Sequence, residues 1–201
     1  TWKSGDEIVL SANEFPSNAY PWLACRDFGA VVRFIDTRER RMTPDVLRGH
    51  LSKRTRIVAV SWVAFNDGYR HDLTALAAVA HEFGALLCVD VMQALGAFPL
   101  DVRACGADAA YGGGAKWLMA LQAVSFLYVR ETLIDQLRLA APGWRSAKDM
   151  WDFLNYDQPF VSDASRFEGG TPNVLGALSL AESMRVLDAA GEGIAVHVLR
   201  L

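Results

Sequence analysis

The chain has 201 residues, of which 52% are hydrophobic and 21% charged, and its formal net charge at pH 7 is −3. This length and apolar content allow one sizeable domain with a hydrophobic core, and the slightly acidic balance gives no electrostatic reason to expect binding to nucleic acid or to an anionic membrane. No apolar run is long enough to span a bilayer, no signal peptide opens the sequence, and the cysteines are three in number, so we expect reduced thiols and a cytoplasmic location.

Five short runs of apolar and β-branched residues predict β-strands. Several of these runs are apolar almost throughout, which is typical of parallel strands whose two faces are both covered by helices. The predicted strands cover residues 7–12, 31–36, 56–63, 85–92 and 123–130.

Helical patterns alternate with these strands. The first begins at Thr43 and Pro44, a threonine cap followed by proline at the first helical position. The second and third cover residues 73–84 and 177–191, each with one apolar face and a glycine at its end. The alternation predicts an α/β fold, a three-layer sandwich around a mainly parallel sheet. Residues 142–173 are expected to form a long ordered excursion.

Ligands of such folds bind beyond the carboxyl ends of the strands, so the residues that follow each apolar run are candidates for a site. Asp90 ends one run and Gln93 follows it, although an aspartate there is by itself more typical of a helix N-cap. Lys116 comes later, behind three glycines and directly before Trp117. An ammonium group among such residues either extends to the surface along its methylene stem or loses its charge and becomes a nucleophile.

Four blocks of sequence, in this order, resemble the class V aminotransferase and cysteine desulfurase family of pyridoxal-phosphate (PLP) enzymes, which have fold type I. The resemblance covers nearly the whole chain and implies that residues 1–201 are most of a large PLP-binding domain, with an N-terminal segment and a C-terminal small domain outside it. The blocks are GDEIVLSANEFPSNAYPW, DLTALAAVAHEFGALLCVDVMQALGAFPLDV, GADAAYGGGAKWLM and RFEGGTPN.

The resemblance implies a role for each candidate residue. Lys116 would form a Schiff base with PLP and then move a proton at the substrate α-carbon, a task that requires a neutral amine and is helped by burial. Asp90 would pair with the pyridine nitrogen and Gln93 would contact the phenolic oxygen. Thr171 would reach the PLP phosphate of the neighbouring subunit, which implies a homodimer with its sites at the interface. The substrate would be a small amino-acid-like molecule that reacts at its α-amino group.

The chain also departs from the family pattern. Gly113 and Ala115 replace a common serine and histidine, residues 120–123 replace Gly-Pro-x-Gly, and Trp62 stands where many desulfurases have asparagine. These departures leave open a second interpretation, a degenerate PLP-fold protein that serves as a binding or structural subunit. The reaction type also stays open among transamination, desulfuration, racemisation and elimination.

Two other classes of site fit the sequence less well. Neither glycine-rich nucleotide-binding motif is satisfied around Lys116. The histidines are scattered, without a pair at ligand spacing, so we expect no metal site and place His71 and His81 in surface or capping positions. Among the tryptophans, Trp62 and Trp144 are candidates to line the site.

Overall fold

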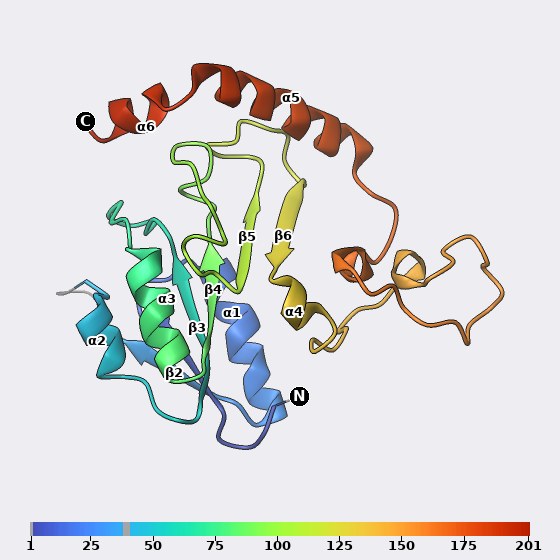
Figure 1. The fold of residues 1–201 in the computed structure, drawn as a ribbon, viewed down its shortest axis with the longest axis horizontal. Coiled ribbons are helices and arrows are strands. Elements are labelled where there is room, and N and C mark those ends of the chain that lie inside the picture. Colours follow the sequence, from blue (N-terminus) through green and yellow to red (C-terminus); the bar gives the residue numbers. More distant parts are fainter. Residues whose placement is uncertain (1, 38–40) are drawn as a thin grey trace.

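The computed structural model describes residues 2–37 and 41–201, and one six-stranded sheet is its central element (Figure 1). The strand order is β2-β1-β3-β4-β5-β6, in which β6 alone runs antiparallel to its neighbour. The strands are β1 (Glu7–Ser11), β2 (Val31–Ile35), β3 (Thr55–Ser61), β4 (Leu86–Asp90), β5 (Ala109–Gly113) and β6 (Ser125–Val129). The mainly parallel sheet and the five expected strands are confirmed.

Helices cover both faces of the sheet and complete the three-layer sandwich. Helix α1 (Pro16–Ala24) lies on one face, and α2 (Pro44–Arg48) and α3 (Leu73–Glu82) lie on the other. The remaining helices are α4 (Glu131–Ile134), α5 (Val174–Ala190) and α6 (Gly193–Val198). Thr43 caps α2 through its side chain, as its position before Pro44 predicts. None of the helices that the structure describes combines the length and apolarity needed to cross a membrane.

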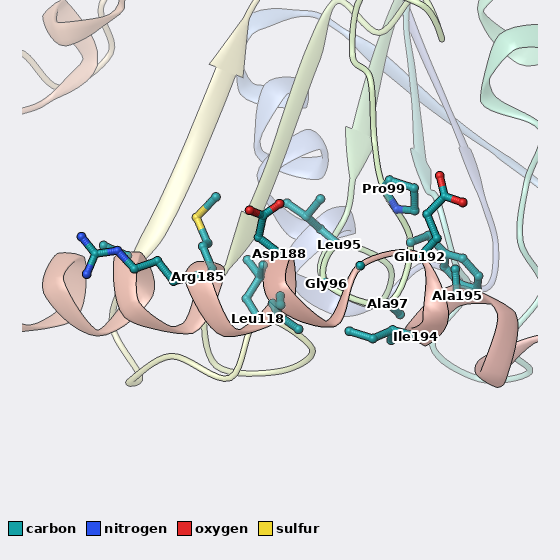
Figure 2. Close-up of a pocket in the computed structure, with 15 residues that line it drawn as sticks. Leu95, Gly96, Ala97, Pro99, Leu118, Arg185, Asp188, Glu192, Ile194 and Ala195 are labelled. Atoms are coloured by element: carbon teal, nitrogen blue, oxygen red, sulfur yellow. The ribbon is translucent and has the colours of Figure 1, made fainter.

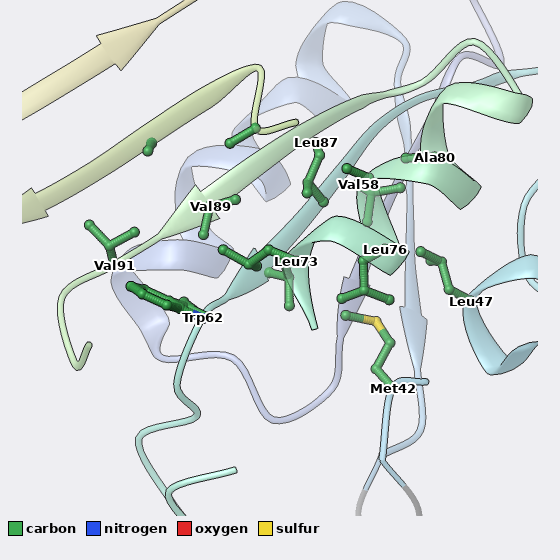
Figure 3. Close-up of a cluster of buried hydrophobic side chains, with 14 of the residues drawn as sticks. Met42, Leu47, Val58, Trp62, Leu73, Leu76, Ala80, Leu87, Val89 and Val91 are labelled. Atoms are coloured by element: carbon green, nitrogen blue, oxygen red, sulfur yellow. The ribbon is translucent and has the colours of Figure 1, made fainter. Parts of the chain in front are cut away.

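Alternate residues of the central strands belong to two separate hydrophobic clusters, one on each face of the sheet. Val9, Val58 and Val89 point to the face covered by α2 and α3, where they pack with Leu76 (Figure 3). The residues between them, such as Ala59, pack on the α1 face. Because the side-chain period of a strand is two, this alternation buries both faces of the sheet and explains the almost continuous apolar runs.

Strand β5 was not expected, because its sequence AAYGG has no β-branched residue and four of its five residues are too small to pack as a strand normally does. The glycine at position 112 lies close to its neighbours. A Cβ atom there would lie 3.2 Å from the ring of Phe126 and 3.2 Å from a methyl group of Val91. Close packing between β4, β5 and β6 therefore overrides the weak local preference.

The last third of the chain extends from this sandwich. Residues 142–173 form the expected excursion, which includes the short turns Trp144–Ser146 and Ala164–Phe167 and an exposed aromatic cluster. In that cluster the Trp144 ring lies 5.8 Å from Trp151 and 6.2 Å from Phe153, centroid to centroid, so Trp144 packs within the excursion. Helix α5 then crosses above the ends of β5 and β6 (Figure 1).

Candidate active site

The carboxyl edge of the sheet brings Asp90 and Lys116 together from neighbouring strands. Asp90 is the last residue of β4 and lies opposite Ser61 of β3 and Tyr111 of β5. Lys116 follows β5 in a loop that returns to β6. Their spacing in the sequence therefore becomes proximity in space, because adjacent parallel strands end at the same edge.

Backbone hydrogen bonds close the Lys116 loop tightly. The Gly114 N–H donates to the Val124 carbonyl at 2.9 Å, and the Ala120 N–H donates to the Gly114 carbonyl at 2.8 Å. Within the loop, Met119 and Ala123 adopt φ angles of 53° and 63°, a left-handed conformation that costs free energy in residues other than glycine. The family's Gly-Pro-x-Gly would supply a glycine at position 123, where this chain has a strained alanine.

Helix α5 holds this loop from above. The Ser179 hydroxyl accepts from the Leu121 N–H at 3.0 Å, and the Ser183 hydroxyl donates to the Met119 carbonyl at 3.1 Å. At the start of the helix, the Asn173 amide donates to the Ala123 carbonyl at 3.0 Å. The strained turn is thus fixed at both of its left-handed residues.

The turn after β4 packs directly on the Lys116 loop. Gly96 has a φ of +103°, and a Cβ atom on it would lie 2.5 Å from the Trp117 carbonyl oxygen, so glycine is required for this approach. The contact forms a pocket of about 450 Å³ whose polar side chains are those of Gln93 and Lys116. Its other lining residues are Gly96, Trp117, Met119, Leu187 and Ile194.

A second, larger pocket adjoins this one and shares Gly96, Leu187 and Ile194 with it. It has a volume of about 550 Å³ and lies between α5, α6 and residues 95–99 (Figure 2). Its lining is mostly apolar, with the charged side chains of Arg185, Asp188 and Glu192 contributed by the α5–α6 region.

The side chain of Lys116 is exposed, which differs from the buried amine that the sequence led us to expect. Its Nζ atom lies 5.5 Å from the ring centroid of Phe15, within the range of a cation–π interaction. Phe65 in turn packs edge-on against Phe15, with ring centroids 5.3 Å apart. In the described chain the amine is therefore open to solvent on one side and faces a pair of aromatic rings on another.

Asp90 is the negative group of the site. Burial raises the pKa of its carboxyl group above the ordinary value, and this effect is opposed by a hydrogen bond from the Met92 N–H and by the positive charge of Lys116. The Met92 N–H donates to Oδ1 at 2.8 Å. The carboxylate is thus held in one orientation while its charge is only partly compensated.

Thr171 lies apart from the other three predicted residues. It is exposed, and it precedes Asn173, which caps α5 with its side chain. It does not line the pocket that contains Gln93 and Lys116. The expected contact of Thr171 with a neighbouring subunit stays a prediction.

Two of the departures from the family pattern have a structural explanation. Trp62 is 9% exposed and packs 6.1 Å from the Phe98 ring in the core, so it is a core residue and the aromatic side chain beside Phe15 is Phe65. At Gly113, an added Cβ would lie 2.8 Å from the terminal methyl group of Met92. Met92 thus fills the space that a serine at position 113 would require.

Sequence reasoning missed several residues around the site. Glu14 and Phe15 follow β1 at the same edge of the sheet, and the rule that ligands bind beyond the strand ends could have identified them. The expectation that His71 lies at the surface was wrong. Its ring is buried, with Nδ1 2.9 Å from the Ser61 carbonyl oxygen, and burial lowers its pKa. His81 pairs with Asp108, at 2.8 Å.

The comparisons with known proteins identify the family and the fold. The family model for aminotransferase class-V matches residues 1–197. A probable cysteine desulfurase of Vibrio cholerae is 32% identical over 206 aligned residues, which cover 100% of this chain and 50% of the relative.

Solved structures share the fold as well. The apo cysteine desulfurase of Thermococcus onnurineus superposes with a TM-score of 0.86 at 29% identity, covering 96% of this chain and 48% of the other. A lysine-to-alanine mutant of C-DES, solved with glycine covalently linked to its PLP cofactor, superposes with a TM-score of 0.82 at 25% identity, covering 94% of this chain and 51% of the other.

The chain belongs to the class-V aminotransferase family. Its fold is that of the large domain of fold type I PLP enzymes, as the resemblance implied. The chain spans about half the length of the curated relatives that it matches.

Proposed function

We propose that this protein is a PLP-dependent enzyme that acts on the α-amino group of a small amino-acid-like substrate. The observation that carries the proposal is the placement of an accessible lysine amine next to a partly buried carboxylate and an aromatic face, at the carboxyl edge of a parallel sheet. This combination offers a covalent anchor, a negative partner and a flat apolar surface within one site.

The residues present fit the cofactor. Lys116 would bind the aldehyde of PLP through Nζ and later move a proton at the substrate α-carbon. Asp90, fixed by the Met92 N–H, would pair with the ring nitrogen, and Gln93, in the same pocket as Lys116, would contact the phenolic oxygen. When bound, PLP supplies an electron sink at the substrate α-carbon. The aromatic ring of Phe15 offers a face on which a flat ring can stack.

The assembly of the enzyme is part of the same proposal. Residues 1–201 would be most of the large PLP-binding domain of a homodimer, in which Thr171 contacts the phosphate group bound by the other subunit. The exposure of Thr171 is compatible with this role, and the free state of Cys25, Cys88 and Cys105 supports a reducing, cytoplasmic location.

The degenerate alternative, a binding or structural subunit without catalysis, fits the site less well. Asp90 is kept partly buried although burial disfavours its charge, so packing does not explain this side chain. A charged side chain that is kept partly buried at a cost in stability is typical of a functional site.

The test is the covalent attachment of PLP to the purified full-length protein. We expect a visible absorption band after addition of PLP, and a pyridoxyl group on the peptide that contains Lys116 after borohydride reduction. The Lys116→Ala variant should lose both signals, whereas the control Lys148→Ala, in the excursion, should keep them. A folded wild-type protein without the band, or with label spread over surface lysines, would contradict the proposal.

A second measurement addresses the reaction. The wild-type protein would be incubated with a panel of amino acids, with and without a 2-keto acid as amino acceptor and in the presence of a thiol reductant, and keto acid, ammonia, sulfide and inverted substrate would be assayed separately. New keto acid that depends on the acceptor indicates transamination, keto acid with ammonia indicates elimination, sulfide without keto acid indicates desulfuration, and inverted substrate indicates racemisation. Absence of turnover with a stable PLP adduct would favour the degenerate alternative.

A further inference from the structure

A partly buried carboxylate with no role in the proposed chemistry lies beneath the site. Glu14 follows β1 at the carboxyl edge, and its side chain accepts three hydrogen bonds. The Ser61 N–H donates to Oε1 at 2.9 Å, and the Ser61 hydroxyl and the Asn18 amide donate to Oε2 at 2.6 and 2.8 Å. Because Ser61 ends β3 and Asn18 lies in α1, this one carboxylate joins three elements.

The hydrogen bonds extend from Glu14 to the strand beside Asp90. The side-chain oxygen Oδ1 of Asn18 accepts from the Tyr111 hydroxyl at 2.6 Å, and Tyr111 lies opposite Asp90 in the sheet. Asn18 is 1% exposed, so its orientation is fixed by these partners. The network therefore connects the turn after β1 to the same strand pair that carries Asp90 and leads to Lys116.

Glu14 also determines where the next residue lies. Phe15 occupies the N-cap position of α1 without a side-chain cap, and its ring is 42% exposed, so packing alone fixes it weakly. Its backbone is held on one side by the anchored carboxylate of Glu14 and on the other by the Asn18 N–H, which donates to its carbonyl at 2.8 Å. The Phe15 ring consequently stays beside Nζ of Lys116, braced by Phe65.

The energetics of Glu14 indicate that this anchor is not there for stability alone. Burial raises the pKa of its carboxyl group, its three donors oppose that effect, and the charge of Asp90 raises the pKa further. Its hydrogen-bond partners are neutral, unlike the arginines that accompany Glu7 at the opposite edge. A neutral side chain would avoid this cost.

We propose that Glu14 is a positioning residue of the Lys116 site, whose anchored carboxylate holds the Phe15 ring in the orientation in which it stacks on the cofactor. The inference rests on the proposed function, since it concerns the same site. Glu14 itself contacts neither cofactor nor substrate and acts through Phe15.

The test compares Glu14→Gln with the matched control Glu82→Gln in the full-length protein. Gln keeps the length of the side chain but presents an amide nitrogen to donors, so at least one of them loses its acceptor. Glu82 is an exposed glutamate at the end of α3 that pairs with Arg48. The readouts are the dissociation constant of PLP and the visible circular dichroism of bound PLP, which reports the fixed orientation of its ring.

We expect Glu14→Gln to weaken PLP binding by about tenfold or more and to reduce the visible dichroism, whereas Glu82→Gln leaves both unchanged. Phe15→Leu should have the same effects, and the double variant should be no worse than Phe15→Leu alone, because both changes remove one contact. In the cofactor-free protein, Glu14→Gln should also speed hydrogen exchange at the Ser61 amide.

Three outcomes would overturn the inference: unchanged PLP binding and dichroism in Glu14→Gln, additive losses in the double variant, or an equal loss in Glu82→Gln. If Glu14→Gln fails to fold, Ser61→Ala removes only one donor and should reduce the dichroism in the same direction. If the wild-type protein binds no PLP, the proposed function is contradicted. If the wild-type protein and the Glu14→Gln variant bind PLP equally well, only this inference is contradicted.

Discussion

Both edges of the sheet carry carboxylates that are removed from solvent, fully at the amino edge and partly at the carboxyl edge, and the two edges compensate the charge differently. At the amino edge, Glu7 is 3% exposed and lies 3.3 Å from Arg33 and 3.4 Å from Arg54. Asp108 at the same edge is fully buried and pairs with Arg130 at 3.0 Å. At the carboxyl edge, Glu14 and Asp90 have no ion pair of this kind within residues 2–37 and 41–201.

The pKa directions follow this difference. At Glu7, burial raises the pKa, but hydrogen bonds from Ser52 and Thr55 and the charge of Arg33 outweigh burial and lower it overall. At Asp90 burial dominates and the pKa is raised. The charges of the amino edge therefore hold strands together, whereas the carboxyl edge keeps incompletely compensated charge, which is typical of functional sites.

The largest effect on stability should come from the amino edge. Asp108→Ala removes the acceptor of the buried Leu87 N–H, which donates at 2.7 Å, and the partner of His81 and Arg130. We expect the free energy of unfolding to fall by about 3 kcal/mol, measured by urea denaturation.

The matched control for that change is Asp135→Ala. Asp135 pairs with Arg166 but is 78% exposed, so its loss should cost less than about 0.5 kcal/mol. Equal effects of the two substitutions would mean that the buried ion pairs of the amino edge do not carry the structural role assigned to them.

A pair of substitutions should change stability in opposite directions at the two edges. Glu7→Gln should destabilise the cofactor-free protein at pH 7 by about 1–2 kcal/mol, because its arginine and hydroxyl partners lose a charged acceptor. Asp90→Asn should stabilise it slightly at pH 7, because the amide keeps the bond from the Met92 N–H and removes a charge that burial disfavours.

The pH dependence of these two effects has a definite sign. Glu7 has a lowered folded pKa, so its contribution is complete above the ordinary value of 4.5 and is lost as the pH falls through the folded pKa. Asp90 has a raised folded pKa, so its cost is complete above that pKa and disappears as the pH falls toward 3.8. Urea denaturation of both variants between pH 7 and 3.5 checks this, and a difference for Asp90→Asn that grows on acidification would contradict it.

The elements that the sequence predicts differ from those that it misses in how strongly local preference specifies them. The sequence predicts the five strands rich in β-branched residues to within two residues at each end. It also predicts that Lys116 and Asp90 belong to one site. The Ala- and Gly-rich β5 and the proline-containing α1 were missed, because tertiary contacts rather than local preference stabilise them.

The surroundings of the lysine were harder to predict than its identity. The glycines and apolar residues beside Lys116 indicated a buried amine, yet Trp117 and Met119 are exposed together with the amine, and of its near neighbours only Gly114 and Leu118 are buried. Glu14 and Phe15 lie about a hundred positions earlier in the chain, and only the parallel order of β1, β3, β4 and β5 brings them to the same edge. Sequence spacing carries no information about such contacts unless the strand order is known.

The smallest expected effect concerns backbone strain, which the carboxyl edge carries in addition to charge. Ala123 adopts a φ of 63°, so Ala123→Gly should raise the free energy of unfolding by about 0.5–1 kcal/mol. Ala120, in the same loop, does not have a positive φ, and Ala120→Gly should instead lower stability slightly. If Ala123→Gly destabilised the protein as much as Ala120→Gly does, the turn after Lys116 would not be strained. If it stabilised the protein but weakened PLP binding, then the strain would contribute to holding Lys116 in place, since a looser turn positions the amine less precisely.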